Sequence, residues 1–475
     1  MNLNLVAIAP ELYMLLLISA LFVWSLGSRD WQPPVEKWIP FFAGLGIFVT
    51  VPAFWTEPQL MFYGVYKVDA MSQFLKVIIA FGFFVCTLNA TRQPTLEEGQ
   101  RADYFMFLAL SAWGLMILTS AVELITIYMA LEISSYSLYA IIPLRSKDKR
   151  AAEAGIKYIL FGAVATAISL FGLSYILAAQ HSTYVVDLVG KSWSFAGSPM
   201  GVVGLTLFLS GMFYKLALFP FHFWCPDVYQ GTSNETAAYV ATLPKVGAVV
   251  VLIRMAAFLQ PGLEITTVLA VLGAISMTFG NLSALVQRDV KRILGFSSVA
   301  HAGYIMVGLV SGTAQGISAA AFYSVAYVLM NLLAFWVVCR VASDGRNIQL
   351  DDLDGLYKRS PALAFSLGVA AFALVGLPPL MGFMGKLFLM TAAWNNGYNW
   401  LVIVLAANSA IAIFYYLSLV RHAYTHEAKE DTPLPDTSVY SVAGAGLLAA
   451  IVVVMGIMPQ PVFELALQAG RGLMP

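Results

Sequence analysis

The chain has 475 residues, of which 60% are hydrophobic and only 11% are charged, whereas an average soluble domain carries about 25% charged residues. The 26 basic and 26 acidic residues balance, so the net charge does not indicate a nucleic acid or an acidic substrate. Cys86, Cys225 and Cys339 are too far apart for a disulfide framework or a metal site. The composition excludes an ordinary soluble domain, and we expect no iron–sulfur cluster and no other cofactor in this chain.

Apolar runs recur along the whole chain, and a helix needs about twenty such residues to cross a ~30 Å hydrocarbon core. A membrane β-barrel would instead show alternating segments of about ten residues. We therefore predict an all-α polytopic membrane protein with about fourteen transmembrane helices. Their approximate cores are residues 5–26, 38–55, 70–91, 103–120, 122–143, 154–179, 200–222, 235–258, 263–286, 292–312, 315–341, 361–393, 399–422 and 438–458.

Lysine and arginine residues gather on one side of these spans, and the other side holds little beyond Lys67 and Lys191. Short cytoplasmic loops are enriched in Lys and Arg, so we expect a multi-pass protein of the bacterial inner membrane with both termini in the periplasm. Residues 1–26 have neither a basic leading region nor a cleavage pattern, which favours a first span over a removed signal. The basic loops contain Arg29, Lys37, Arg92, Arg101, Arg145, Lys147, Lys149, Arg150, Arg288, Lys291, Arg340, Arg346, Lys358, Arg359, Arg421 and Lys429.

Four ionisable residues have apolar sequence on both sides: Glu132, Lys215, Lys245 and Lys386. An ionisable group in mid-membrane costs from a few to more than ~10 kcal/mol, so each is a functional candidate. The alternatives are a side chain that reaches the interface and a static ion pair. A carboxylate close to Lys215 would hold its proton, and separation of the pair would release that proton to a neighbour such as Lys245. We predict a proton relay of these four residues.

Further ionisable residues are weaker candidates. Lys157 follows a basic loop closely, so it is either a relay residue or an interface anchor. His301 titrates near neutrality in its ordinary state, and it is either a relay element or a hydrogen-bonded core histidine. We expect His222 to be structural or to lie at the outlet of a helix break. We expect Lys76 to extend to the outer interface from the third span.

Two predicted spans contain prolines inside their apolar runs, Pro220 in one and Pro378 with Pro379 in the other. Proline removes a backbone donor and clashes with the preceding turn, so both helices should break there. Irregular backbone at membrane depth requires surrounding protein or a water-filled cavity. Each break has a lysine nearby, Lys215 before the first and Lys386 after the second, so both breaks predict buried polar sites. The alternative at each is a simple kink.

The broken spans are the seventh and the twelfth, which suggests two copies of a five-helix unit. An odd number of helices inverts the second copy, and inverted repeats with discontinuous helices are a known transporter architecture. Lys215 and Lys386 would then lie in opposite half-channels. The predicted units are the first three helices (1–102), the first repeat (103–258), the second, inverted repeat (259–425) and the last helix (426–475).

Three stretches are more specific: LFPFHFWCPDVYQG, QRDVKRILGFSSVAHAGY and GLPPLMGFMGKLFL. They resemble the antiporter-like, proton-translocating subunits of respiratory complex I and of multisubunit cation/proton antiporters. Among these the chain is most similar to the subunit N family of NADH-quinone oxidoreductase. It is short, it ends soon after the fourteenth span without a long lateral helix, and Lys386 stands where subunit M would have a glutamate.

The resemblance implies that Glu132, Lys215, Lys245 and Lys386 carry protons, driven by quinone reduction elsewhere in the complex. It also implies a translocase without redox chemistry in this chain, subunits K and M as neighbours, and NAD, FMN, iron–sulfur clusters and quinone in partner subunits. One departure is the run TSNETAAYVATLPK, with Glu235 and a proline before Lys245, where the family has a proline-containing run.

Three alternatives to this function stay open. A subunit of a cation/proton antiporter or a membrane-bound hydrogenase would share the fold and the lysines. A secondary transporter of a small solute would need a solute cavity with a neutral polar lining. A structural scaffold would not need four ionisable residues in mid-span.

Overall fold

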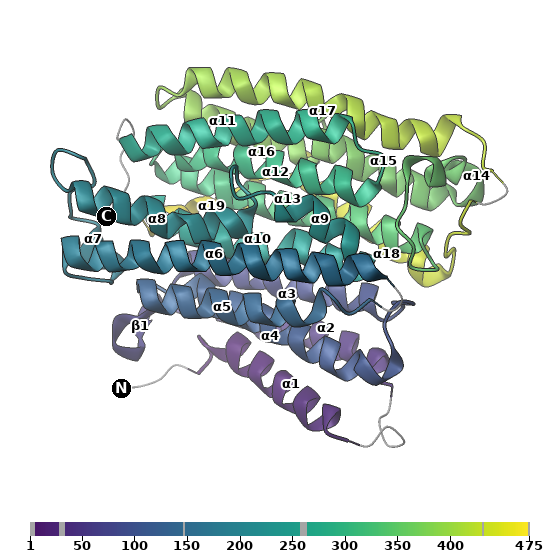
Figure 1. Ribbon diagram of the computed structural model, residues 1–475, viewed down its shortest axis with the longest axis horizontal. Coiled ribbons are helices and arrows are strands. Elements are labelled where there is room, and N and C mark those ends of the chain that lie inside the picture. Colours follow the sequence, from purple (N-terminus) through teal and green to yellow (C-terminus); the bar gives the residue numbers. More distant parts are fainter. Residues whose placement is uncertain (1–4, 28–33, 146–147, 257–263, 430–431, 474–475) are drawn as a thin grey trace.

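The computed structural model describes residues 5–27, 34–145, 148–256, 264–429 and 432–473. The helices lie side by side along the long axis of one bundle, with α1 at one edge and α17 at the opposite edge (Figure 1). Arg29 and Lys147 of the predicted basic loops lie outside the described residues, as do the predicted end of the eighth span and the start of the ninth.

The first half of the chain contains the elements up to the tenth helix. A short antiparallel hairpin of β1 and β2 joins the second and third helices, with Leu60 opposite Lys67. In chain order the elements are α1 (Ala9–Ser25), α2 (Val35–Ala53), β1 (Gln59–Met61), β2 (Tyr66–Val68), α3 (Ala70–Ala90), α4 (Arg101–Ser120), α5 (Leu124–Ile141), α6 (Lys149–Gln180), α7 (Val185–Leu188), α8 (Pro199–Leu216), α9 (Trp224–Gly231) and α10 (Asn234–Ala256).

The second half also contains long helices and one broken span, and it ends in a short helix. Its elements are α11 (Glu264–Leu285), α12 (Val290–Leu309), α13 (Ala314–Val341), the 3-10 turn η4 (Leu350–Leu353), α14 (Leu356–Arg359), α15 (Pro361–Val375), α16 (Met381–Trp394), α17 (Asn399–Thr425), α18 (Val439–Ile457) and α19 (Gln460–Arg471).

The predicted all-α membrane fold is confirmed. In the described part of the chain, 11 helices are long and apolar enough to cross a membrane, and α1 and α15 are shorter apolar helices. Each predicted span overlaps one helix, except that the predicted span 361–393 covers both α15 and α16. The predicted span 200–222 covers α8 and the break but ends before α9 begins at Trp224. The sequence did not predict α19 or the β-hairpin. The 12-residue α19 is too short and too polar on one face to register as a spanning segment.

Two helices form the centre of the bundle. Every residue of α10 is buried, and so is nearly all of α13, which packs against it. Both helices are mostly apolar and have no distinct polar face, and a helix of this kind is stable only where neighbours cover every side. By contrast, only about a third of α6 is buried, and the rest faces outward. Lys245 of α10 therefore lies far from the lipid-facing surface.

Both predicted helix breaks are present. The first separates α8 from α9, and the second separates α15 from α16. The residue after α8 is Ala217, with a left-handed φ of 62°, and the residue after α15 is Gly376, with φ of 87°. A left-handed residue ends a helix, and its N–H caps a carbonyl of the last turn, as Ala217 does for Tyr214 and Gly376 for Ala373. The final carbonyls of the helix have no partner within it. These carbonyls become acceptors in the site.

A buried array of lysines as the candidate functional site

Glu132 and Lys215 are brought together by α5 and α8, but they form no direct ion pair. The hydroxyl of Thr166 donates to Glu132 Oε1 at 2.7 Å. Lys215 Nζ donates to Ser135 Oγ at 2.9 Å and to the Tyr158 hydroxyl at 3.3 Å. Ser135 lies one turn after Glu132, on the same face of α5. The carboxylate of Glu132 and the hydrogen-bond partner of Lys215 therefore lie one helical turn apart on α5.

Lys245 connects to the broken seventh span through its main chain. Its Nζ donates to the carbonyl of Leu216, the last residue of α8, at 3.1 Å. Leu216 follows Lys215 directly, so consecutive residues of α8 contact Ser135 and Lys245. A second hydrogen bond joins Lys245 Nζ to the hydroxyl of Ser298 on α12. Because the helix break frees the Leu216 carbonyl, the break itself supplies a hydrogen-bond acceptor for Lys245.

From Ser298 a series of hydroxyl and imidazole groups continues between α12, α13 and α17. Ser298 Oγ is hydrogen-bonded to the Tyr327 hydroxyl. One turn further along α12, His301 Nδ1 lies 2.8 Å from the Tyr323 hydroxyl, and its Nε2 lies 3.4 Å from the Tyr416 hydroxyl. His301 is thus a buried histidine with a hydrogen-bond partner on each nitrogen.

Lys386 lies at the far end of the series and repeats the arrangement of Lys245. Its Nζ donates to the carbonyl of Val375, the last residue of α15, at 2.8 Å, and to Ser409 Oγ at 3.0 Å. The amine lies 4.3 Å from the centre of the Tyr304 ring, and Tyr304 is one turn from His301. At both breaks, a lysine therefore sits at the negative end of a helix, which favours its cation.

The four predicted residues are buried, with exposed fractions of 7% for Glu132, 1% for Lys215, 2% for Lys245 and 3% for Lys386. None of the lysines reaches the surface, which rules out the interface alternative. Their hydrogen-bond partners are neutral hydroxyls and carbonyls. A buried charge without a counterion is costly, so each of these lysines stays a functional candidate.

Lys157 lies apart from the array that Glu132, Lys215, Lys245 and Lys386 form. Its Nζ makes two ion pairs at 2.7 Å, with Glu153 and Asp227, and its side chain is 35% exposed. Asp227 is shared with Arg292, also at 2.7 Å. This network joins α6, α9 and α12, so Lys157 has the surroundings of an interface anchor. His222 packs against aromatic rings including that of Phe279, as a structural residue would.

The expectation for Lys76 was wrong. Its side chain is fully buried, and its Nζ pairs with Glu11 Oε1 of α1 at 2.7 Å. The Tyr66 hydroxyl donates to the same carboxylate oxygen at 2.6 Å. Sequence patterns could not find this pair, because Glu11 lies in another apolar run and only the packing of α1 near α3 brings the two together. The pair holds the N-terminal helix to the bundle.

Glu11→Gln should destabilise the protein by about 3–5 kcal/mol, because it leaves the Lys76 cation buried without a counterion. The double variant Glu11→Gln with Lys76→Met should recover most of this loss. Thermal unfolding of the detergent-solubilised chain, measured for both single variants and the double variant, gives the coupling energy. Equal destabilisation by the double variant and the sum of the single variants would contradict the pairing.

Sequence reasoning missed a second group of buried charges, at the start of α10 upstream of Lys245. Glu235 is 2% exposed, and Lys291, counted above as a loop residue, is fully buried in the first turn of α12. Lys291 Nζ and the Arg145 guanidinium both donate to the carbonyl of Thr232, at 2.7 and 3.1 Å. The unusual segment before Lys245 is therefore a buried, charged helix entry, and Lys245 keeps its place in the array.

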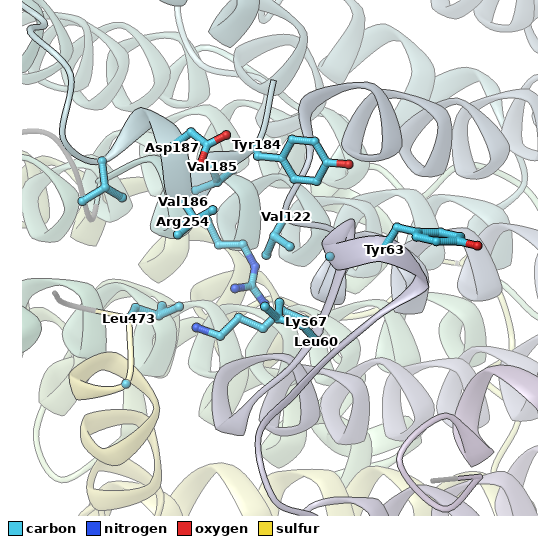
Figure 2. A pocket seen from close by; sticks show the side chains of 13 residues that line it. Leu60, Tyr63, Lys67, Val122, Tyr184, Val185, Val186, Asp187, Arg254 and Leu473 are labelled. Atoms are coloured by element: carbon cyan, nitrogen blue, oxygen red, sulfur yellow. The ribbon is translucent and has the colours of Figure 1, made fainter. Parts of the chain in front are cut away.

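A cavity of about 630 Å³ lies at one end of the bundle, between the hairpin, α7 and the residues after α19. Figure 2 shows Arg254 and Lys67 among its lining residues. Both cations pair with Asp69, at 3.0 and 3.8 Å. None of the four array residues lines this cavity. Its lining combines valine and leucine with two tyrosines, Tyr63 and Tyr184, and the charged side chains of Lys67, Asp187 and Arg254.

The fold and the site agree with what the chain is similar to. A family model described as NADH:quinone oxidoreductase/Mrp antiporter, transmembrane, matches residues 121–412. NADH-quinone oxidoreductase subunit N 2 of Solidesulfovibrio magneticus is 62% identical over 99% of this chain and 100% of its own length.

Two solved structures extend the comparison. A chain of respiratory complex I from Thermus thermophilus is 31% identical, with a TM-score of 0.84 over 96% of this chain and 99% of its own. A chain of the Mrp complex from Dietzia sp. DQ12-45-1b reaches a TM-score of 0.86 over 99% and 98%, but at 20% identity this likeness shows the fold alone. The chain belongs to the NADH-quinone oxidoreductase subunit N family, the antiporter-like, proton-translocating membrane subunits of respiratory complex I.

Proposed function

We propose that Glu132, Lys215, Lys245 and Lys386 carry protons through this subunit, with His301 between the last two. The observation that carries the proposal is the series of buried hydrogen-bonding groups from α5 to α16. A proton cannot cross low-dielectric protein without groups that accept and release it at short intervals. Lys157, with its surface ion pairs, is not included in this path.

Transfer along the series depends on how the Lys215 cation is compensated. The Glu132 carboxylate, on the same face of α5 as Ser135, favours the protonated amine. If the carboxylate turns away, Lys215 keeps only the neutral acceptors Ser135 and Tyr158. Its charged form then becomes costly, and the proton moves toward Lys245, with Leu216 and water in between. In the same way, loss of compensation at Lys245 would move its proton through His301 to Lys386.

In the complete enzyme, we propose that quinone reduction drives this movement from other subunits. NAD, FMN, iron–sulfur clusters and quinone would bind in those partners, with subunits K and M as neighbours and both termini of this chain in the periplasm.

Residues 103–258 and 259–425 would form the two inverted repeats, flanked by 1–102 and 426–475. The support is the pair of breaks, each with a lysine on a last-turn carbonyl.

Glu132→Gln tests the proposal with little change of shape, because glutamine can still accept the hydrogen bond from Thr166. We expect NADH-driven proton uptake by inverted membrane vesicles to fall by about tenfold or more, since a positioned proton-transfer group contributes at least that much. The matched control is Glu153→Gln, whose side chain is 63% exposed. Unchanged uptake in a fully assembled Glu132→Gln complex would show that this carboxylate has no part in transfer.

A further inference from the structure

Three potential metal ligands meet at the end of α17, in a region that the lysine array does not use. His422 lies in the last turn of α17 and His426 directly follows the helix, while Asp354 lies between η4 and α14. The Nδ1 atoms of His422 and His426 lie 2.6 and 3.3 Å from Asp354 Oδ1. All three ligand atoms lie within 4.8 Å of one another. The histidines are four positions apart, so His426, just after the helix, lies one turn beyond His422 on the same side.

The three side chains are held in place by the surrounding backbone. The side chains of Asp354 and His422 are 5% and 10% exposed. The N–H of Gly355 donates to the His422 carbonyl at 3.3 Å, and Arg359 donates to the Asp354 carbonyl at 3.0 Å. Gly355 has a φ of +63°, and a Cβ there would lie 2.8 Å from the backbone nitrogen of Ala428. The loop before α15 is thus packed closely onto the end of α17.

We propose that Asp354, His422 and His426 bind a divalent transition-metal ion of the zinc class. Two imidazole nitrogens and one carboxylate oxygen are a three-ligand set that zinc takes when it keeps a fourth position for water, and imidazole also suits copper, nickel and iron. The carboxylate supplies a negative charge, and the last carbonyls of α17 add to it. His426, 39% exposed, leaves the site open to solvent.

Binding needs only a small rearrangement. Each Nδ1 must present its lone pair, so any proton there moves to Nε2 or to water. The hydrogen-bonded contacts at 2.6 and 3.3 Å would open slightly to admit an ion about 2.0–2.2 Å from each ligand. The bound ion would attach the loop that contains Asp354 to the end of α17. The same helix carries Ser409, which accepts a hydrogen bond from Lys386. The competing view is an aspartate that simply accepts hydrogen bonds from two histidines.

The test is zinc binding by the full chain, purified in detergent through an affinity tag without histidine. Equilibrium dialysis against micromolar Zn²⁺, with zinc measured by mass spectrometry, should give one ion per chain. His422→Ala, His426→Ala and Asp354→Ala should each weaken binding by more than about tenfold, since even the outer partners of a metal ligand contribute about 10- to 100-fold. His181→Ala, at the exposed end of α6, is the matched control and should bind as wild type does.

The His426→Ala variant makes the test independent of folding, because this half-exposed side chain lies beyond the last turn of α17. Cobalt gives a second readout, since Co²⁺ in a site of this kind shows visible absorption bands that the three variants should lose. Absence of zinc uptake by the wild-type chain would overturn the proposal. So would equal binding by the wild type and a folded His426→Ala variant.

Discussion

Replacing Lys215 by alanine should reduce NADH-driven proton uptake by at least about tenfold, while the complex still assembles in the membrane. Lys215 lies between Glu132 and Lys245. Its amine donates to Ser135, on the helix that carries Glu132, and the carbonyl of the next residue, Leu216, accepts from Lys245. Without the amine, α8 loses its hydrogen bond to Ser135 on α5, and no ionisable group remains at this position between Glu132 and Lys245. Proton uptake by inverted vesicles, followed with a pH-sensitive dye, measures the loss.

Two further variants separate the charge of Lys215 from its volume and from general effects of lysine removal. Lys215→Met fills most of the space of the side chain, so it should assemble as wild type does and yet show the same loss of uptake. Lys191→Ala removes an exposed lysine from the loop after α7 and should change nothing. Near-normal uptake in assembled Lys215→Ala and Lys215→Met complexes would make Lys215 a structural residue.

The membrane fold could be predicted because hydrophobicity is a local property. Long apolar runs locate the spans, and Pro220 and Pro379 locate the breaks, since a proline acts on its own helix whatever its neighbours are. The short helix α19 was missed for the same reason. Its apolar face is covered by α13 and α3, and only the complete bundle reveals that.

The candidate site was predictable as a list of residues but not as a path. A lysine within an apolar run can be recognised from the sequence alone, as Lys245 and Lys386 were. Their partners do not, because Ser298, Tyr327 and Ser409 are ordinary residues of membrane helices, and the acceptors at the breaks are main-chain carbonyls. Pairing between distant helices is equally invisible, and so the buried partner of Lys76 was missed.

The two breaks provide a common physical element for the site. Ending a helix inside the bundle frees carbonyls that would otherwise be hydrogen-bonded within the helix. At the end of α8 such a carbonyl accepts from Lys245, and at the end of α15 another accepts from Lys386. A fixed backbone dipole stabilises a cation there without neutralising it, so the lysine can still lose its proton. A direct carboxylate partner would hold the proton more firmly.

Lys245→Arg should abolish proton uptake as completely as Lys245→Met, with a loss of at least about tenfold in each. Arginine keeps the positive charge and can still donate to Leu216 and Ser298, but its guanidinium does not release a proton in proteins. A relay needs a group that alternates between charged and neutral forms, whereas a static cation only needs the charge. The two substitutions therefore distinguish these roles at one position.

The measurement is again uptake by inverted vesicles, with NADH oxidation and complex assembly followed in the same preparations. The control is Lys358→Arg, at an exposed lysine paired with Glu427, where the charge alone matters and uptake should stay at the wild-type level. If Lys245→Arg pumps normally while Lys245→Met does not, Lys245 acts as a fixed charge, and the proton passes between Lys215 and His301 by another route. If both fail while Lys358→Arg pumps, Lys245 gives up and regains its own proton in each cycle.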